Sequence, residues 1–229
     1  MRIWPLLESL PGGIQLAIAP PQWGDEVLLT EELAAAAAHA GRRRRQFATA
    51  RHLARLLMRR CGLVPAQVGV AANGAPLWPS GCTGSISHAA DLVAVALSAD
   101  EGAGTDPAIG LDIERIGRIG PELWPTLFSS EEIANLGLWS QASQAMVATT
   151  AFCLKEAFLK LPGPDLPAFD LPDLHAVPAP ARPDQGAPEA ADWGVVSASS
   201  LVQARGLSMP LRLWTGQCAG HALGLLRST

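Results

Sequence analysis

Two segments of the chain place apolar residues at intervals of three and four, which puts these residues on one face of an α-helix. The segments are 42–61 and 142–161, and Pro162 prevents the second from continuing. A shorter helix is expected at 30–40, and another is expected to begin at Ser129. The pattern therefore predicts helices in both halves of the chain.

Shorter apolar runs that are bounded by turn residues predict strands between these helices. The interval 100–108 is polar and glycine-rich, so it predicts a boundary between two halves of the chain. Eight of the nineteen prolines fall within 162–188, which predicts an irregular loop there. The strands are expected at 67–71, 84–88, 92–98, 109–114, 195–199, 211–214 and 222–226.

The composition is that of a folded protein, because 48% of the 229 residues are hydrophobic and only 17% are charged. No apolar run reaches the roughly 18 residues that a membrane span needs. Near the start of the chain Pro5, Glu8 and Pro11 interrupt the apolar stretch, so an export signal is not expected. The four cysteines lie far apart and form neither a CxxC pair nor a disulfide-like framework. We therefore expect a soluble, cytoplasmic protein that does not contact a membrane.

The charged residues are unevenly distributed along the chain. A net charge of −4 argues against a general nucleic-acid binder. Eight of the fifteen arginines nevertheless lie between Arg42 and Arg60, and the only two lysines, Lys155 and Lys160, are five residues apart on one expected helix. The run Arg42–Arg45 alone is typical of a solvated or a nucleic-acid-facing patch. The position of both lysines on one expected helix draws attention to that helix.

Asp112 and Glu114 alternate along an expected strand, so their carboxylates point to the same side. Adjacent negative charges repel each other unless a cation lies between them. Mg²⁺ prefers such hard oxygen ligands and completes its octahedron with phosphate oxygens and water. The pattern is common, however, and taken alone it more often marks an exposed strand face.

Other polar residues also have structural explanations when each is taken alone. Glu156 and Lys160 have the spacing of an ion pair on a solvated helix face. Glu132 has the spacing that completes a capping box with Ser129. His88 ends an expected strand, where a lone histidine is usually part of the core.

The order and spacing of the motifs favour a functional role for these residues over the structural explanations. The segments 109–114 (IGLDIE), 128–132 (FSSEE) and 152–160 (FCLKEAFLK) resemble, in sequence and order, the motifs of the 4′-phosphopantetheinyl transferases of the surfactin-synthetase-activating type. Upstream, 74–79 (GAPLWP) and 84–88 (GSISH) are similar to the enterobactin-synthase component D branch of that family.

The resemblance implies an α+β fold with two similar α/β halves, related by a pseudo-twofold axis, and an active site with coenzyme A in the cleft between them. By this analogy the halves are 1–101 and 107–229. The first half would bind the phosphate and adenosine side of coenzyme A, and the second would carry the metal-binding carboxylates. A second half within one chain can stand in for a dimer partner, so we expect a monomer.

The resemblance also implies a role for individual residues. Glu156 is the first choice for the base that removes the proton from the attacking serine, and Glu132 is the second. The Mg²⁺ ligands are expected to be Asp112, Glu114 and Glu156. The residues expected to bind coenzyme A are Arg43, Arg51, Arg55, Ser87, His88, Lys155 and Lys160, with Lys160 on the pyrophosphate. Ala75 replaces a lysine that is frequent in the family, so the pairing of each arginine with a phosphate stays open.

The implied activity is transfer of 4′-phosphopantetheine from coenzyme A to a serine of an apo acyl- or peptidyl-carrier protein, with 3′,5′-ADP as the second product. Such carrier domains belong to fatty-acid, polyketide or nonribosomal-peptide synthases, including those that make siderophores. The alternative is a non-catalytic module that binds coenzyme A or a carrier protein. The presence of Asp112, Glu114, Glu156 and Lys160 argues against this alternative, because a decayed site would be free to lose its metal ligands.

Overall fold

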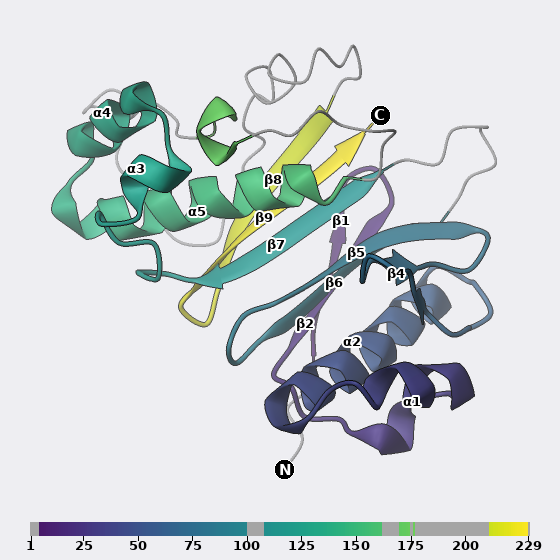
Figure 1. Cartoon of the computed structure of the whole chain (residues 1–229). Helices are drawn as coiled ribbons and strands as arrows, with labels where there is room; N and C mark the ends of the chain where they lie inside the picture. Colours follow the sequence, from purple (N-terminus) through teal and green to yellow (C-terminus); the bar gives the residue numbers. More distant parts are fainter. Residues whose placement is uncertain (1–4, 100–107, 162–169, 175, 177–210, 229) are drawn as a thin grey trace. The chain divides into compact units, whose positions relative to one another are not determined.

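The computed structural model describes residues 5–99, 108–161, 170–174, 176 and 211–228 of the chain. It divides into two compact units, Met1–Ile109 and Gly110–Thr229 (Figure 1). Both units combine helices with a sheet, which confirms the mixed α and β architecture that the sequence predicts. Among the described residues, no helix is both long enough and apolar enough to cross a membrane.

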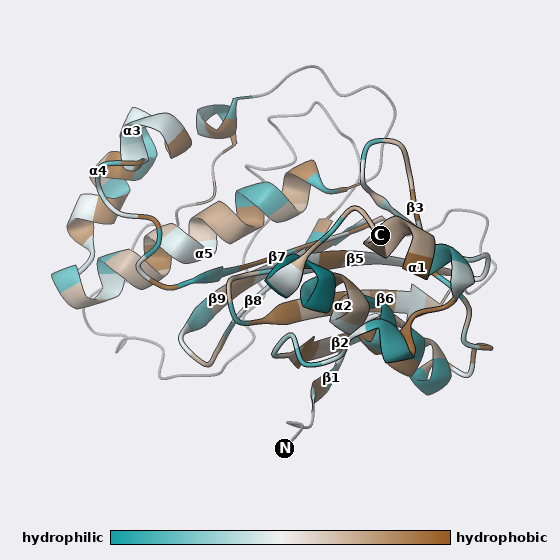
Figure 2. Ribbon diagram, turned by 60° about the horizontal axis from the view of Figure 1, so that its bottom comes forward, coloured by the Kyte–Doolittle hydropathy of each residue, from teal (hydrophilic) through white to brown (hydrophobic). Residues whose placement is uncertain are grey.

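The first unit is built on a four-stranded sheet with the order β1-β2-β6-β5. All neighbouring strands are antiparallel. The helix α2 (Gly41–Arg60) packs its apolar face on this sheet, and its core residues include Leu53, Leu57 and Met58. The arginine-rich start of α2 is hydrophilic, and this end is teal in Figure 2. The strands are β1 (Leu6–Leu10), β2 (Ile14–Ala19), β5 (Cys82–His88) and β6 (Val93–Ala99).

Short elements complete the first unit around α2. They are the 3₁₀ turn η1 (Asp25–Val27), the helix α1 (Thr30–Ala36) and the two-residue strands β3 (Gly69–Val70) and β4 (Pro76–Leu77). The helix α1 is shorter than expected, and Gly41, with a φ of 53°, begins α2 instead of ending α1.

The second unit contains a three-stranded sheet with the order β7-β9-β8. The strands are β7 (Ile109–Arg115), β8 (Leu211–Cys218) and β9 (His221–Ser228), and β8 pairs with β9 in an antiparallel hairpin. The long helix α5 (Gln141–Leu159) packs on β9. The helices α3 (Trp124–Leu127) and α4 (Ser130–Leu138) and the turn η2 (Leu171–Asp173) lie beside α5 in the same unit (Figure 1). The strand expected at 195–199 lies outside the described residues, as does most of the loop 162–188.

Two glycines let the backbone of α5 lie directly against its sheet. A Cβ atom at Gly110 of β7 would be 1.8 Å from the carbonyl oxygen of Ala157. A Cβ atom at Gly224 of β9 would be 2.8 Å from the backbone of Cys153 and Leu154. A side chain at either position would therefore push the helix away. The close packing brings the last turns of α5 next to the carboxylates of β7.

Candidate functional site

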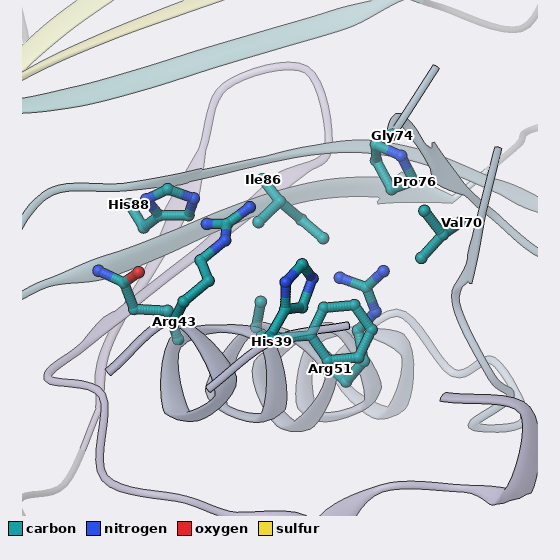
Figure 3. Close-up of a pocket in the computed structure, with 11 residues that line it drawn as sticks. His39, Arg43, Arg51, Val70, Gly74, Pro76, Ile86 and His88 are labelled. Atoms are coloured by element: carbon teal, nitrogen blue, oxygen red, sulfur yellow. The ribbon is translucent and has the colours of Figure 1, made fainter. Parts of the chain in front are cut away.

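The first unit holds a pocket with a volume of about 200 Å³ (Figure 3). It lies between the first half of α2, the end of β5 and the β3–β4 region. Three residues that the sequence predicts to bind coenzyme A line it together, namely Arg43, Arg51 and His88. The arginines are eight positions apart on α2 and the histidine comes from β5, so the fold brings together residues that are distant in the sequence.

Arg51 is held firmly in place at the pocket wall. Its side chain is 5% exposed, and its Nε donates to the carbonyl of Val68 at 3.0 Å while a terminal nitrogen donates to Gly69 at 3.2 Å. The guanidinium lies 4.0 Å from the centroid of the Phe47 ring, a cation–π contact. Burial lowers the pKa of Arg51 to about 10, so the side chain is still cationic at neutral pH. A fixed cation of this kind is suited to an anionic ligand.

Arg43 is exposed at the start of α2 and reaches into the same pocket (Figure 3). Its guanidinium makes no hydrogen bond to another residue that the structure describes. Partial burial lowers the pKa of Arg43. Arg43 therefore offers hydrogen-bond donors to a ligand, in contrast to the anchored Arg51.

Arg55 and Ser87, which the sequence predicts to bind coenzyme A, do not line this pocket. Arg55 forms a buried ion pair with Glu32, with its nitrogen 2.8 Å from both carboxylate oxygens, and it also donates to the carbonyl of Val27. Ser87 is 6% exposed and adjoins His88 on a strand, so the two side chains point to opposite faces of the sheet. Arg55 lies one helical turn after Arg51 but is occupied by its ion pair with Glu32, and strand geometry separates Ser87 from His88.

The second unit gathers the predicted metal-binding and catalytic residues at β7 and the end of α5. The ammonium of Lys160 lies 2.5 Å from Asp112 Oδ1 and also donates to the carbonyl of Leu111 at 3.2 Å. Glu114 accepts two hydrogen bonds from Arg118, at 2.7 and 2.9 Å. Two of the three predicted ligands are thus neutralised by cations of the chain itself.

Glu156 belongs to the same electrostatic cluster. Burial raises the pKa of Glu156, the negative charges of Asp112 and Glu114 raise it further, and Lys160 opposes the shift. The side chain is half-buried. A carboxylate with a raised pKa accepts a proton more readily than an exposed carboxylate does. A cation bound beside it would favour the ionised form and so lower the pKa again.

The donor chemistry of these three carboxylates fits a hard divalent cation such as Mg²⁺. As they lie, however, no three or more side chains of His, Cys, Asp and Glu among the described residues form a cluster that could hold a metal ion. Metal binding by Asp112, Glu114 and Glu156 would require Arg118 to release Glu114, because Arg118 holds both oxygens of that carboxylate, whereas Lys160 holds Asp112 through Oδ1. The side chain of Arg118 is 64% exposed and that of Glu114 is 14% exposed, and an ion pair near the surface contributes little free energy, so a divalent ion would compete with this pair.

Lys155 and Glu132 are both buried and bind each other. The Lys155 ammonium lies 2.7 Å from Glu132 Oε2 and donates to the carbonyls of Leu127 at 2.8 Å and Leu171 at 2.9 Å. The side chain of Lys155 is fully buried, and that of Glu132 is 1% exposed. Burial lowers the pKa of Lys155, and Glu132 opposes the shift. The three donors of Lys155 are thus matched by three acceptors inside the unit.

Glu132 has further structural partners besides Lys155. It completes the predicted capping box with Ser129 and accepts a hydrogen bond from the backbone N–H of Ala176 at 2.7 Å. Glu132, the second choice for the base, and Lys155, one of the residues expected to bind coenzyme A, are therefore used to hold α4, α5 and η2 together. The capping box was readable from the sequence, whereas the partner lysine, 23 positions away, was not.

Comparison with known proteins assigns both units to one family. Residues 30–98 match the 4′-phosphopantetheinyl transferase N-terminal domain, and residues 108–199 match the 4′-phosphopantetheinyl transferase superfamily. The two matched ranges together cover more than half of the chain.

Similar curated proteins carry the same description. The 4′-phosphopantetheinyl transferase Npt of Nocardia iowensis is 47% identical over 47 residues, 20% of this chain and 21% of that protein. PptT of Mycobacterium tuberculosis is 39% identical over 62 residues, 27% of each chain. Svp of Streptomyces mobaraensis is 37% identical over 93 residues, 40% of this chain and 36% of that protein. The matches thus span between about a fifth and just over a third of these relatives. Taken with the two domain matches and the motifs of β7 and α5, they show that the chain belongs to the 4′-phosphopantetheinyl transferase family.

Proposed function

We propose that this protein transfers the 4′-phosphopantetheine group of coenzyme A to a serine hydroxyl of an apo acyl- or peptidyl-carrier protein. The observation that carries the proposal is the cluster of Asp112, Glu114, Glu156 and Lys160 at β7 and α5, within a chain of this family. Three carboxylates beside one lysine suit a reaction that depends on positioning and charge neutralisation at a diphosphate.

In this reaction the serine oxygen forms a bond to the β-phosphorus of coenzyme A, and the bond from that phosphorus to the bridging oxygen breaks. The leaving group is 3′,5′-ADP. The serine proton goes to Glu156, a half-buried carboxylate at the end of α5 beside the other two carboxylates. The pairing of Glu132 with Lys155 supports Glu156 over Glu132 as the base, and it supports a structural role for Lys155 instead of contact with coenzyme A.

Mg²⁺ held by Asp112, Glu114 and Glu156 would neutralise the diphosphate and the charge that develops on the leaving group. Lys160 adds a compact cation beside these carboxylates. In the first unit, Arg43, Arg51 and His88 would bind phosphate groups of coenzyme A in the pocket that they line.

The rival function is a module that binds coenzyme A or a carrier protein without turnover. Incubation of the protein with coenzyme A, Mg²⁺ and an apo carrier protein decides between them, with the carrier read by intact mass. A gain of one phosphopantetheine group is expected, and an unchanged carrier mass alongside measurable coenzyme A binding would support the rival.

His88→Ala tests the pocket separately from the chemistry. A phosphate contact made equally in the ground state and the transition state is uniform binding, so the variant should raise KM for coenzyme A more than it lowers kcat. Arg59→Ala is the matched control, because Arg59 is exposed on α2 and does not line the pocket. An unchanged KM with a collapsed Tm for His88→Ala would assign the histidine to the core.

The finer aspects of the proposal follow the sequence motifs. We propose that the chain belongs to the surfactin-synthetase-activating type and resembles the enterobactin-synthase component D branch most. We also propose that it is a monomer and works in the cytoplasm. Its partners would be carrier domains of fatty-acid, polyketide or nonribosomal-peptide synthases. Carrier domains are acidic, and the exposed cations at the start of α2 suit association with them. Of these cations, Arg44 is already bound to Asp25 at 2.8 Å.

A further inference from the structure

His39 lies in the arginine pocket of the first unit, although no motif of the sequence pointed to it. The residue follows α1, and its backbone N–H donates to the carbonyl of Ala36 at 2.9 Å. Its ring centroid is 5.4 Å from that of Phe47. The same Phe47 ring supports the Arg51 guanidinium. One aromatic side chain thus positions both an imidazole and a guanidinium at the pocket wall.

The groups that face His39 are cationic. Arg43 and Arg51 approach from α2, and Figure 3 shows the imidazole between their side chains. Arg44 acts from the same helix, although Asp25 compensates its charge. His88 of β5 lines the pocket as well, and the described lining residues include no carboxylate. Glu32 acts on Arg51 from outside the pocket lining. A proton on His39 would therefore add a further positive charge to a pocket whose described lining holds cations and no carboxylate.

This arrangement disfavours the protonated imidazole. Burial lowers the pKa of His39, and Arg43, Arg51 and Arg44 lower it further. An anion in the pocket would reverse the electrostatic part of this effect, because it would neutralise the arginines and attract the imidazolium directly.

On the basis of the proposed coenzyme A site, we propose that His39 takes up a proton and contacts a phosphate group when the nucleotide portion of coenzyme A occupies this pocket. The bound phosphate then faces two arginines and an imidazolium. Binding and proton uptake are linked, so the affinity for coenzyme A increases as the pH falls toward the pKa of His39 in the unliganded protein.

The useful pH range is limited by the ligand. A phosphate monoester has a second pKa of about 6, and its own protonation weakens binding below that pH. The His39 contribution is therefore measured between about pH 6.5 and pH 8.5. The pKa of His39 in the unliganded protein lies below its ordinary value, so if binding raises it by about one unit, the gain in affinity at pH 6.5 is at most about fivefold.

The test is calorimetric titration of the full chain with coenzyme A in phosphate-free buffers of different ionisation enthalpy. Wild type should take up a measurable fraction of a proton at pH 7. His39→Gln should abolish most of this uptake and weaken binding about two- to fivefold at pH 6.5, with less than a twofold effect at pH 8.5. Arg59→Ala and His88→Gln are the controls, because the first keeps the pocket intact and the second removes the other pocket histidine.

A second measurement is independent of any loss of folding in the variant. The imidazole resonances of His39, followed by NMR over the same pH range, should titrate at higher pH when coenzyme A is bound. A titration that coenzyme A leaves unchanged, or an equal proton uptake by wild type and His39→Gln, would overturn the proposal.

Further experiments identify which phosphate group His39 contacts and distinguish a failure of this proposal from a failure of the proposed function. With 3′-dephospho-coenzyme A, loss of the His39 effect assigns the contact to the 3′-phosphate, and retention assigns it to the diphosphate. If wild type modifies the carrier protein but His39→Gln shows normal proton uptake, the His39 proposal alone fails. If wild type binds no coenzyme A, both proposals fail.

Discussion

Lys160 reaches across from the end of α5 to Asp112 of β7, where its ammonium lies 2.5 Å from a carboxylate oxygen of a residue 48 positions earlier in the chain. A lysine that only paired with Glu156 along a solvated helix face would not need this approach. The contact places Lys160 against the strand that carries the candidate metal ligands, with its side chain 33% exposed and that of Asp112 6% exposed.

Lys160→Ala should lower kcat for holo-carrier formation about 10²–10³-fold, because a preorganised charge at a partly desolvated diphosphate is lost. Stability should also fall by about 1–3 kcal/mol, since Asp112 loses a partner in a buried position. Lys160→Arg should restore stability but only part of the rate, because a planar guanidinium does not occupy the space of an ammonium. Wild-type turnover in both variants would show that Lys160 has only a structural role.

Removal of divalent metal by EDTA should abolish transfer, and Mg²⁺ or Mn²⁺ should restore it. Asp112→Asn should lower Mn²⁺ affinity as measured by electron paramagnetic resonance, because a charged ligand is lost. Arg118→Ala should instead leave the affinity unchanged or tighten it up to about fivefold, since an exposed pair such as that with Glu114 is worth about 0.2–1 kcal/mol. Weaker Mn²⁺ binding by Arg118→Ala would argue against Glu114 as a ligand.

Gly110→Ala should destabilise the protein by about 3 kcal/mol or more, because the added Cβ would overlap the carbonyl oxygen of Ala157. Gly137→Ala is the matched control. A Cβ at Gly137 in α4 meets nothing within 4 Å, so the change should stabilise the helix by about 0.5 kcal/mol. Thermal and urea unfolding of both variants provide the measurement, and equal stability for the two would contradict the close packing of α5 on β7.

Lys155→Met should destabilise the protein by about 3–5 kcal/mol, because Glu132 is left as an uncompensated buried charge. The fraction of protein that stays folded should keep the wild-type KM for coenzyme A. Adding Glu132→Gln should recover part of the lost stability, which a double-mutant cycle of unfolding free energies would measure. A raised KM in folded Lys155→Met would return this lysine to the coenzyme A site.

Glu156→Gln should raise Tm in EDTA while it lowers kcat by about 10²-fold or more. The stability gain is expected because the substitution removes a half-buried negative charge that Asp112 and Glu114 repel. The rate loss is expected because an amide cannot accept the serine proton. Glu131→Gln, at an exposed position in the first turn of α4, is the control and should show neither effect.

The elements that the sequence predicts well are those whose pattern is long and regular. The helix expected at 42–61 is Gly41–Arg60 in the structure, and the strand expected at 92–98 is Val93–Ala99. The hairpin of β1 and β2 was missed, although Gly12 and Gly13, both with positive φ, separate two apolar runs there. That turn signal is local and was available from the sequence.

The sequence motifs predicted which residues carry the chemistry of the candidate site. They predicted less well which of these residues contact one another, because those contacts depend on packing. Adjacent residues of a strand point to opposite faces, so Ser87 and His88 could already have been separated by periodicity. Lys155 and Lys160 are about 140° apart around a helix of 3.6 residues per turn, which could have separated them too. The partner of Arg55 could not be foreseen, because Glu32 lies 23 positions away on another helix.

The contrast between the two lysines has a practical use in chemical labelling. They are the only lysines of the chain, and the side-chain amine of Lys155 is sealed inside the second unit while that of Lys160 is accessible. Amine-directed acylating reagents applied to the native protein should therefore modify a single lysine, which lies beside Asp112. Lys160 thus offers a chemical handle at the candidate active site, and protection of this amine by a bound ligand would report occupancy without any enzymatic turnover.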